Sequence, residues 1–243
     1  MAVSRAERLL TAANRHSLAL IWSGSLLAAM PAGVLGWDAI NGSLGIDPLD
    51  RVLRTPGRWA LILLLVVLAA TPLRHALVFT ARRSGLRYGR RLADWNWVIR
   101  LRRPLGLASF FYALTHGLLY FSLDAGFSMS EVAGDLRSKP FIVAGLGAFL
   151  LLLPLAVTST DAWMRRLKRN WKRLHFLVYP AAILGALHFA WLSKPGTEDF
   201  HFYALALGLL LGYRLIARWL HGGPPVGALG DEVVREADPI RKE

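Results

Sequence analysis

Residues 104–123 read PLGLASFFYALTHGLLYFSL, an apolar run with no charged side chain and with His116 inside it. An α-helix needs about 20 predominantly apolar residues to cross the hydrocarbon core of a bilayer. Five further uncharged runs occupy positions 17–37, 59–73, 140–160, 174–193 and 200–213. Those at 59–73 and 200–213 are short, so we expect them to include flanking residues, with Arg74 and Arg214 extending outward to the membrane surface. The sequence therefore predicts an all-α polytopic membrane protein with six transmembrane helices.

The composition supports this fold class and excludes several kinds of site. Of the 243 residues, 54% are hydrophobic, yet the formal net charge is +13 and the mean hydropathy is +0.39. Because the charges are confined to short segments between the apolar runs, they indicate membrane loops and not a nucleic-acid-binding surface. The absence of cysteine excludes disulfides, zinc–thiolate sites and iron–sulfur clusters. Any metal must therefore be held by oxygen ligands or by the seven histidines.

The loop charges predict the orientation of the helices. Residues 74–103 contain nine arginines against one acidic residue, and residues 161–173 contain six basic residues against one. The segments 38–58 and 124–139 are nearly balanced, and 194–199 is slightly acidic. Since an excess of lysine and arginine marks cytoplasmic loops, both termini are predicted to be cytoplasmic. We divide the chain into an N-terminal segment (1–16), a helix bundle (17–219) and a polar tail expected to be disordered (220–243). The arginine-rich stretch 76–100 is expected to lie on anionic membrane lipid.

Two histidines are predicted to lie at the same depth inside the membrane. His116 lies about 20 Å from the basic end of its run at 1.5 Å per residue, and His188 lies at a similar depth in the fifth run. The third and fifth runs are parallel, so the two imidazoles can face each other, and a pair of neutral imidazoles suits the axial positions of a b-type haem. Tyr112 and Tyr120, one turn on either side of His116, are candidates for the haem surroundings. The alternative for each histidine is a hydrogen bond to a neighbouring helix.

His175 is a candidate ligand for a second haem. It lies roughly 20 Å from His188 along the fifth run, toward the basic end. The corresponding position on the third run is Arg102, which cannot ligate iron but can pair with a haem propionate. His75, at the basic end of the second run, is a possible partner for His175, and its alternative is a solvated residue at the membrane boundary.

These residues also carry a family resemblance. Residues 102–107 (RRPLGL), together with Tyr112 and His116, resemble the third helix of ferric-reductase-like membrane domains, and residues 174–179 (LHFLVY), together with His188, resemble the fifth. More narrowly, the chain resembles the MsrQ family. The segments that carry this narrower resemblance are 44–48 (LGIDP), 55–61 (TPGRWAL), 71–74 (TPLR) and 156–159 (AVTS).

The resemblance implies a six-helix b-type haem protein of the bacterial inner membrane. Such a protein passes electrons from the respiratory quinone pool to MsrP, a periplasmic molybdopterin enzyme that reduces methionine sulfoxide in oxidised periplasmic proteins. The family's haem-ligating histidines correspond to His116, His175 and His188. The resemblance also implies FMN, for which no residue of this chain is assigned. The chain is then an electron-transfer subunit, and the sulfoxide chemistry takes place on the partner.

Two other functions are compatible with the predicted fold. One is the haem subunit of a ferric or other metal-ion reductase, which receives electrons from a separate cytosolic flavin enzyme. The other is a haem-free transporter or scaffold in which the histidines form a proton path. Acidic residues inside the apolar runs would favour the transporter, and the runs contain none.

Overall fold

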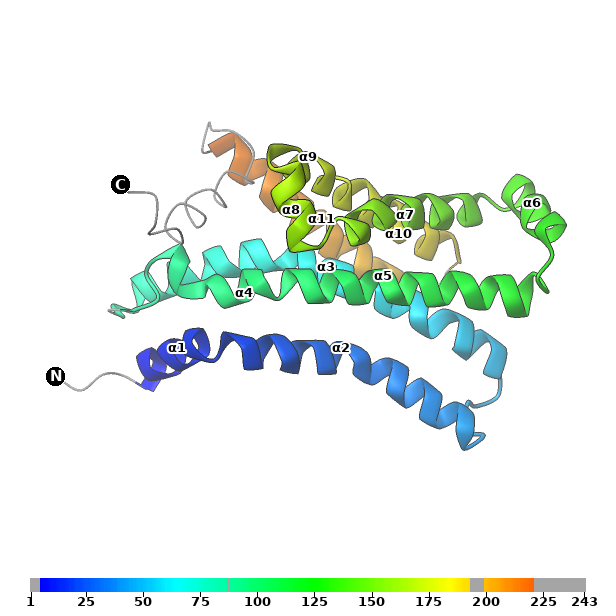
Figure 1. Cartoon of the computed structure of the whole chain (residues 1–243), viewed down its shortest axis with the longest axis horizontal. Helices are drawn as coiled ribbons and strands as arrows, with labels where there is room; N and C mark the ends of the chain where they lie inside the picture. Colours follow the sequence, from blue (N-terminus) through cyan, green and yellow to red (C-terminus); the bar gives the residue numbers. More distant parts are fainter. Residues whose placement is uncertain (1–4, 87, 193–198, 221–243) are drawn as a thin grey trace.

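The computed structural model describes residues 5–86, 88–192 and 199–220, and within these ranges it is built from helices without a β-strand. In chain order the elements are α1 (Arg5–Arg15), α2 (Ser17–Ile40), α3 (Pro48–Arg83), the 3₁₀ turn η1 (Leu92–Trp95), α4 (Asn96–Arg100), α5 (Arg102–Leu119), the π-helical turn η2 (Tyr120–Asp124), α6 (Met129–Ser138), α7 (Pro140–Val157), α8 (Asp161–Leu167), α9 (Arg169–His175), α10 (Val178–Leu192) and α11 (Asp199–Leu220). Figure 1 shows the long helices side by side, with α6 at one end of the bundle and α1 at the other. We call these the α6 end and the basic end; the basic end also carries α8 and α9.

The number and character of the long helices confirm the predicted fold class. Five segments are long and apolar enough to cross a membrane: Ser17–Ile40, Pro48–Arg83, Leu92–Asp124, Pro140–Val157 and Arg169–Leu192. A shorter apolar helix covers His201–Ala217. The chain is therefore an all-α polytopic membrane protein. The predicted tail 220–243 lies outside the described residues apart from Leu220.

The core of the bundle forms around α3. Leu61, Leu64, Leu65 and Leu68 of this helix pack against α7, α10 and α11. The contacting positions of α10 are small, because Ala181, Ala182 and Ala186 face the leucines and let the two backbones approach. On another side of α3, the buried Ser109 of α5 donates a hydrogen bond to the carbonyl of Ala60 (2.7 Å). Helix α3 thus contacts α5, α7, α10 and α11 and lies at the centre of the bundle's packing.

The expected outward extension of Arg74 is wrong. Helix α3 continues to Arg83, and its arginine at position 74 is buried, with hydrogen bonds to the carbonyl of Leu92 and to Oδ1 of Asn96 (both 2.9 Å). Trp95 and Val98, which follow the arginine-rich loop, pack back onto α3. The first residues of the stretch 76–100 therefore continue α3 to Arg83, and residues near its end pack against α3. The expectation that the stretch lies on membrane lipid describes only part of its position.

Arg214 also points inward and not toward the membrane surface. Its Nη2 donates a hydrogen bond to the carbonyl of Leu68 in α3 (2.7 Å). This carbonyl lacks its usual helical donor, because position 72 is a proline without an N–H group. The guanidinium of Arg214 thus remains inside the bundle because Pro72 leaves the carbonyl of Leu68 free to accept its hydrogen bond.

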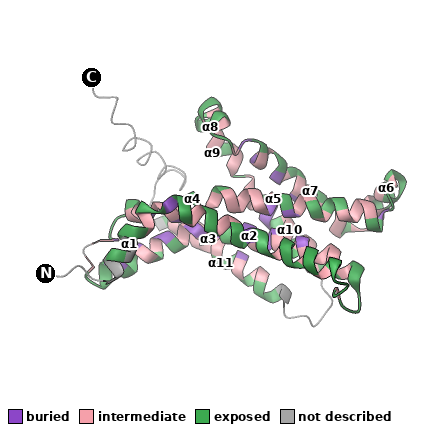
Figure 2. Ribbon diagram, turned by 60° about the horizontal axis from the view of Figure 1, so that its bottom comes forward, coloured by how far each residue is buried: buried purple, intermediate pink, exposed green. Residues whose placement is uncertain are grey.

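Helix α2 lies at the edge of the bundle and is mostly exposed or half-buried (Figures 1 and 2). Tyr112 of α5 connects it to the core: the phenol donates to the carbonyl of Ala28 (2.8 Å) and accepts from the amide of Ala32 (3.1 Å). These two backbone groups are four residues apart and would otherwise pair with each other in the helix. Pro31 lies beside them, so the tyrosine hydroxyl reinforces α2 where a proline weakens it.

Tyr112→Phe is expected to loosen α2 without affecting the interior. The substitution removes both hydrogen bonds and should lower the free energy of unfolding by about 1 kcal/mol. Thermal unfolding in detergent measures this change. The content of any bound haem should remain at the wild-type level, and a loss of haem in this variant would show that Tyr112 belongs to the haem surroundings.

Candidate functional site

A cavity of about 790 Å³ lies between α3, α5, α7 and α10 and extends to α6. Its walls are mainly aliphatic and aromatic, and this size and lining are typical of cofactor pockets. The polar and charged side chains in its lining are few: Asp47, Asp50, Arg54, Arg58, His116, Tyr120 and His188. The cavity is thus mainly apolar and contains two imidazoles. Its arginines and carboxylates come from the first turns of α3 and from the N-cap of that helix, at the α6 end of the bundle.

The two predicted histidines meet in this cavity. His116 of α5 and His188 of α10 have ring centroids 5.9 Å apart, in an edge-to-face arrangement with an interplanar angle of 68°. They come from two long helices, α5 and α10, that are separated in the sequence by α7, and their meeting is what the equal-depth argument predicts. Their contact brings together two potential metal ligands in an otherwise apolar space.

Each imidazole is oriented by a backbone carbonyl of a neighbouring helix. His116 Nδ1 donates to the carbonyl of Leu53 in α3 (2.8 Å), and His188 Nδ1 donates to the carbonyl of Phe141 in α7 (2.6 Å). A carbonyl can only accept, so the proton of each neutral ring is on Nδ1. The lone pair of each ring is then on Nε2, which is the arrangement in which a histidine oriented through its other nitrogen ligates a metal.

A glycine makes room for each ring. Gly57 lies four residues after Leu53, and an added Cβ there would be 3.2 Å from Cε1 and Nδ1 of His116. Gly145 lies four residues after Phe141, and an added Cβ would be 2.8 Å from Nδ1 of His188. Both imidazoles therefore occupy the same kind of seat, which consists of an accepting carbonyl and a glycine one turn further along the same helix.

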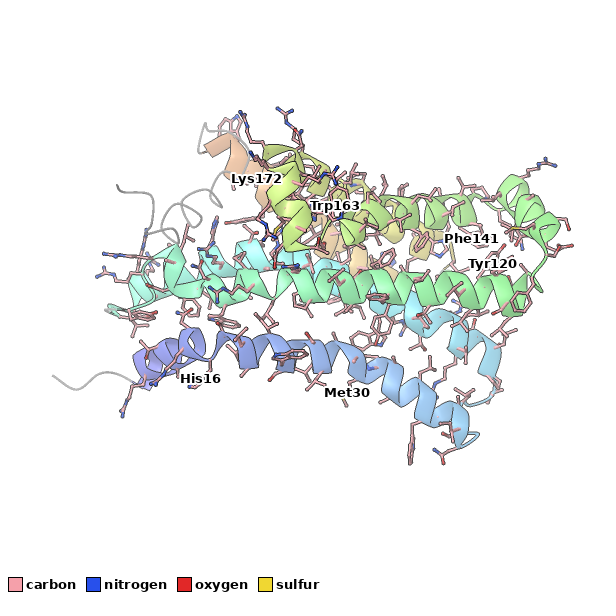
Figure 3. The ribbon with its side chains drawn as sticks, viewed as in Figure 1. His16, Met30, Tyr120, Phe141, Trp163 and Lys172 are labelled. Carbon is pink, nitrogen blue, oxygen red and sulfur yellow. The ribbon has the colours of Figure 1, made fainter. Side chains whose placement is uncertain are left out.

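The α6 end of the cavity is bordered by a short helix that is held by polar contacts. Tyr120, which lines the cavity, donates to Oδ2 of Asp135 in α6 (2.7 Å), and Lys139 Nζ pairs with Oδ1 of the same carboxylate (2.7 Å). Tyr120 begins the π-helical turn η2, and turns of this kind are frequent at functional sites. Figure 3 shows Tyr120 and Phe141 at the same end of the bundle as α6, with Lys172 and Trp163 toward the basic end. The three-residue contact fixes α6 over the cavity.

The contact should weaken in acid. The Lys139 ammonium, followed by the Tyr120 hydroxyl, holds the pKa of Asp135 below its ordinary value of 3.8. Because the folded pKa lies below the unfolded one, the stabilisation is present above the unfolded pKa and is lost as the pH falls through the folded value. We expect wild-type protein to melt at a higher temperature than Asp135→Asn at neutral pH, and this difference to shrink as the pH falls through the ordinary carboxyl pKa of 3.8 and below it. A difference that does not change with pH would contradict the ionic contact.

The other predicted residues lie elsewhere. Tyr112 bonds to α2 and is not among the residues that line the cavity. His175, at the end of α9, stacks on Trp171 with a centroid distance of 3.8 Å and hydrogen-bonds its carbonyl (3.1 Å). Arg102 is the charged side chain whose electrostatic effect reaches His175. His75 contacts the hydroxyl of Tyr213 through Nδ1 (2.7 Å).

Sequence reasoning did not find the groups that orient the two histidines. The accepting carbonyls carry no side-chain signal. A detectable signal was present at Gly57, which directly follows Pro56 inside a long helix. Proline disturbs the hydrogen bonds of the preceding turn, and a glycine beside it leaves the backbone accessible to a side chain of another helix.

The residues of the cavity fit a haem. Two neutral imidazoles from facing helices would offer two nitrogen ligands, the aliphatic walls suit an apolar macrocycle, and Arg54 and Arg58 place positive charge in the same cavity, where it would suit propionate groups. In the described part of the chain no cluster of three or more histidine and carboxylate side chains offers a different metal site.

Comparison with known proteins agrees with this architecture. Residues 56–186 match the family described as ferric reductase like transmembrane component. The chain is 42% identical over 194 residues to the protein-methionine-sulfoxide reductase heme-binding subunit MsrQ of Xanthomonas axonopodis pv. citri, covering 77% of this chain and 82% of that protein. It is 38% identical over 218 residues to the protein of the same name from Ralstonia nicotianae, covering 88% and 90%. The chain therefore belongs to the MsrQ family of ferric-reductase-like membrane proteins.

Proposed function

We propose that His116 and His188 are the two axial ligands of a b-type haem and that the chain carries electrons across the bacterial inner membrane. The observation that carries this proposal is the pair of matching seats, which hold two facing imidazoles with their Nε2 lone pairs available inside an apolar cavity. The names of the relatives, which describe a heme-binding subunit, support it.

The bound haem would supply one-electron redox chemistry, and the protein controls its surroundings. The carbonyls of Leu53 and Phe141 keep Nδ1 protonated and increase the basicity of each ligand. The leucines and phenylalanines of the walls exclude water, and α6 covers the cavity at one end. Tyr120, which lines the cavity beside α6, belongs to the proposed haem surroundings.

The basic end is proposed to face the cytoplasm, as the lysines and arginines of α8 and α9 require under the positive-inside rule. The α6 end then faces the periplasm, and both termini are cytoplasmic. Electrons come from the quinone pool, or from a reduced flavin, and leave toward a periplasmic methionine sulfoxide reductase, MsrP. FMN belongs to this proposal as a second redox group, without assigned residues.

His175 is proposed to ligate a second haem nearer the basic end, with Arg102 toward a propionate. Its ring is already held by Trp171, both through stacking and through a hydrogen bond from Nδ1 to the carbonyl. As in the two seats described above, this bond leaves Nε2 as the nitrogen available to a metal.

An optical spectrum of the purified protein tests the main proposal. Sharp α and β bands after dithionite reduction, with about one or two haems per chain in a pyridine haemochrome assay, are expected for six-coordinate low-spin b-type haem. Protein that folds but stays colourless after haem supplementation would overturn the proposal and favour a haem-free transporter or scaffold. In membranes, reduction by quinol supports the proposed donor, and reduction only by NADH with a flavin reductase would indicate a metal-ion reductase instead.

A further inference from the structure

Helix α6, which borders the cavity, has one apolar face. Met129, Val132 and Leu136 are spaced at i, i+3 and i+7, so they lie on the same side of the helix, and all three line the cavity. The residues between them are small or polar and mostly exposed. Figure 1 shows α6 at one end of the bundle, in the connection between α5 and α7. The apolar face of α6 therefore forms part of the cavity wall at this end.

Met129 is the most accessible residue of this face. It is the first residue of α6 and is 72% exposed, whereas Val132 and Leu136 are half-buried. It also lies outside the segments that can cross a membrane, because one of these ends at Asp124 and the next begins at Pro140. The thioether of Met129 is therefore at the boundary between the cavity and the surrounding water.

The other methionines in the described part of the chain, Met30 and Met164, have different surroundings. Met30 is 62% exposed but lies in the middle of α2, in the candidate span Ser17–Ile40, so lipid covers it in a membrane. Met164 is half-buried in α8 at the basic end. A water-soluble oxidant reaches a thioether most readily when the side chain is exposed to water. Of these three residues, Met129 is the one that offers its sulfur to such an oxidant.

We propose that Met129 is a site of reversible oxidation and that its sulfoxide loosens α6 from the cavity. Hydrogen peroxide supplies the oxygen: a sulfur lone pair forms the S–O bond, the O–O bond breaks, and water leaves while the sulfur loses two electrons. The product replaces an apolar contact with a polar group. Because a sulfoxide is stabilised by water and not by an apolar wall, it favours positions of α6 in which residue 129 turns away from the cavity.

The reversal of this oxidation has a natural agent. The relatives are described as subunits of a protein-methionine-sulfoxide reductase, and oxidised Met129 is a protein methionine sulfoxide. Reduction takes two electrons and two protons, breaks the S–O bond and releases the oxygen as water. This step rests on the proposed function, in which the chain supplies electrons to MsrP. The chain would then carry, at the edge of its own cavity, a substrate of the system that it serves.

Oxidation is tested on full-length protein in lipid nanodiscs treated with hydrogen peroxide. Peptide mass spectrometry should show that Met129 becomes sulfoxide at least about fivefold faster than Met30 or Met164. Hydrogen–deuterium exchange of residues 129–138 should then be at least about twofold faster than in untreated protein, because fewer contacts hold α6. Equal oxidation of the three methionines, or unchanged exchange after oxidation of Met129, would overturn the proposal.

Three variants separate the effect of the sulfoxide from general oxidative damage. Met129→Leu keeps an apolar side chain that peroxide does not oxidise, so exchange of α6 should be the same before and after treatment. Met164→Leu is the matched control, which removes a methionine at the other end and should respond to peroxide as the wild type does. Met129→Gln introduces a polar group without an oxidant and should exchange faster from the start. Faster exchange of α6 in peroxide-treated Met129→Leu would contradict the assignment.

The reversal is measured by adding purified MsrP and a chemical reductant, so that no electrons from this chain are needed. Met129 sulfoxide should return to methionine, and exchange of α6 should return to its untreated rate. A sulfoxide that persists would overturn the reversal and leave the proposed function intact. Wild-type protein without haem would overturn the proposed function and leave the peroxide measurements unaffected, so the two proposals can fail separately.

Discussion

Replacing either His116 or His188 with alanine is expected to abolish the haem between α5 and α10. In the proposed site each imidazole would supply one of the two nitrogen ligands, and the remaining polar side chains of the cavity are arginines, carboxylates and one tyrosine, none of which replaces a neutral imidazole as a ligand of low-spin haem. The haem content per chain should fall at least tenfold in each variant. Purified protein, a pyridine haemochrome assay and the reduced spectrum measure it.

His175→Ala is the matched control for this experiment, because it removes a histidine from the same polypeptide segment but not from the cavity. We expect it to keep the haem of the cavity and to remove only a second haem. A full haem complement in His116→Ala or His188→Ala would disprove the pairing. Loss of every haem in His175→Ala would mean that the two sites have been assigned incorrectly.

The long helices and the meeting of the two histidines were predictable because both depend on simple periodic quantities. Charge-free runs identify segments that can cross a membrane. The rise of 1.5 Å per residue then places His116 and His188 at one depth on parallel helices. The contact between their rings agrees with this calculation. Neither inference needs to know how side chains pack.

The positions of Arg74, Arg214 and Tyr112 could not be predicted in the same way. A charged residue at the edge of an apolar run ordinarily extends to the membrane surface, but a carbonyl freed by a proline, or a loop that folds back, offers an internal alternative. Arg214 uses the first and Arg74 the second. Tyr112 lies one turn from His116, yet its hydroxyl bridges backbone groups of α2. Each outcome depends on which backbone groups lack partners, and that is a property of the folded helices together.

Gly145→Ala is expected to cause the second largest loss of haem. A Cβ at this position would lie 2.8 Å from Nδ1 and 2.9 Å from Cε1 of His188, closer than non-bonded atoms approach. The ring must therefore move away from α7, and the hydrogen bond to the carbonyl of Phe141 is lost or distorted. Loss of such an orienting contact typically weakens metal binding by about 10- to 100-fold. The measurement is haem per chain, followed by the reduction midpoint of the haem that remains.

Alanine substitutions at Gly147 and Gly57 show whether the loss of haem in Gly145→Ala comes from displacement of His188 or from general overpacking between helices. Gly147→Ala adds the same methyl group to the same helix, but its Cβ would be 3.2 Å from Cδ1 of Leu184, a flexible side chain away from the imidazole. It should leave the haem content and midpoint close to wild type. Gly57→Ala, with its nearest ring atoms at 3.2 Å, should fall between the two and affect His116. If Gly145→Ala and Gly147→Ala behave alike, the glycine next to His188 serves helix packing and does not position the ligand. The ranking of Gly145, Gly57 and Gly147 expected here follows from how close each added methyl group comes to an imidazole, so it tests the two seats independently of the histidine substitutions.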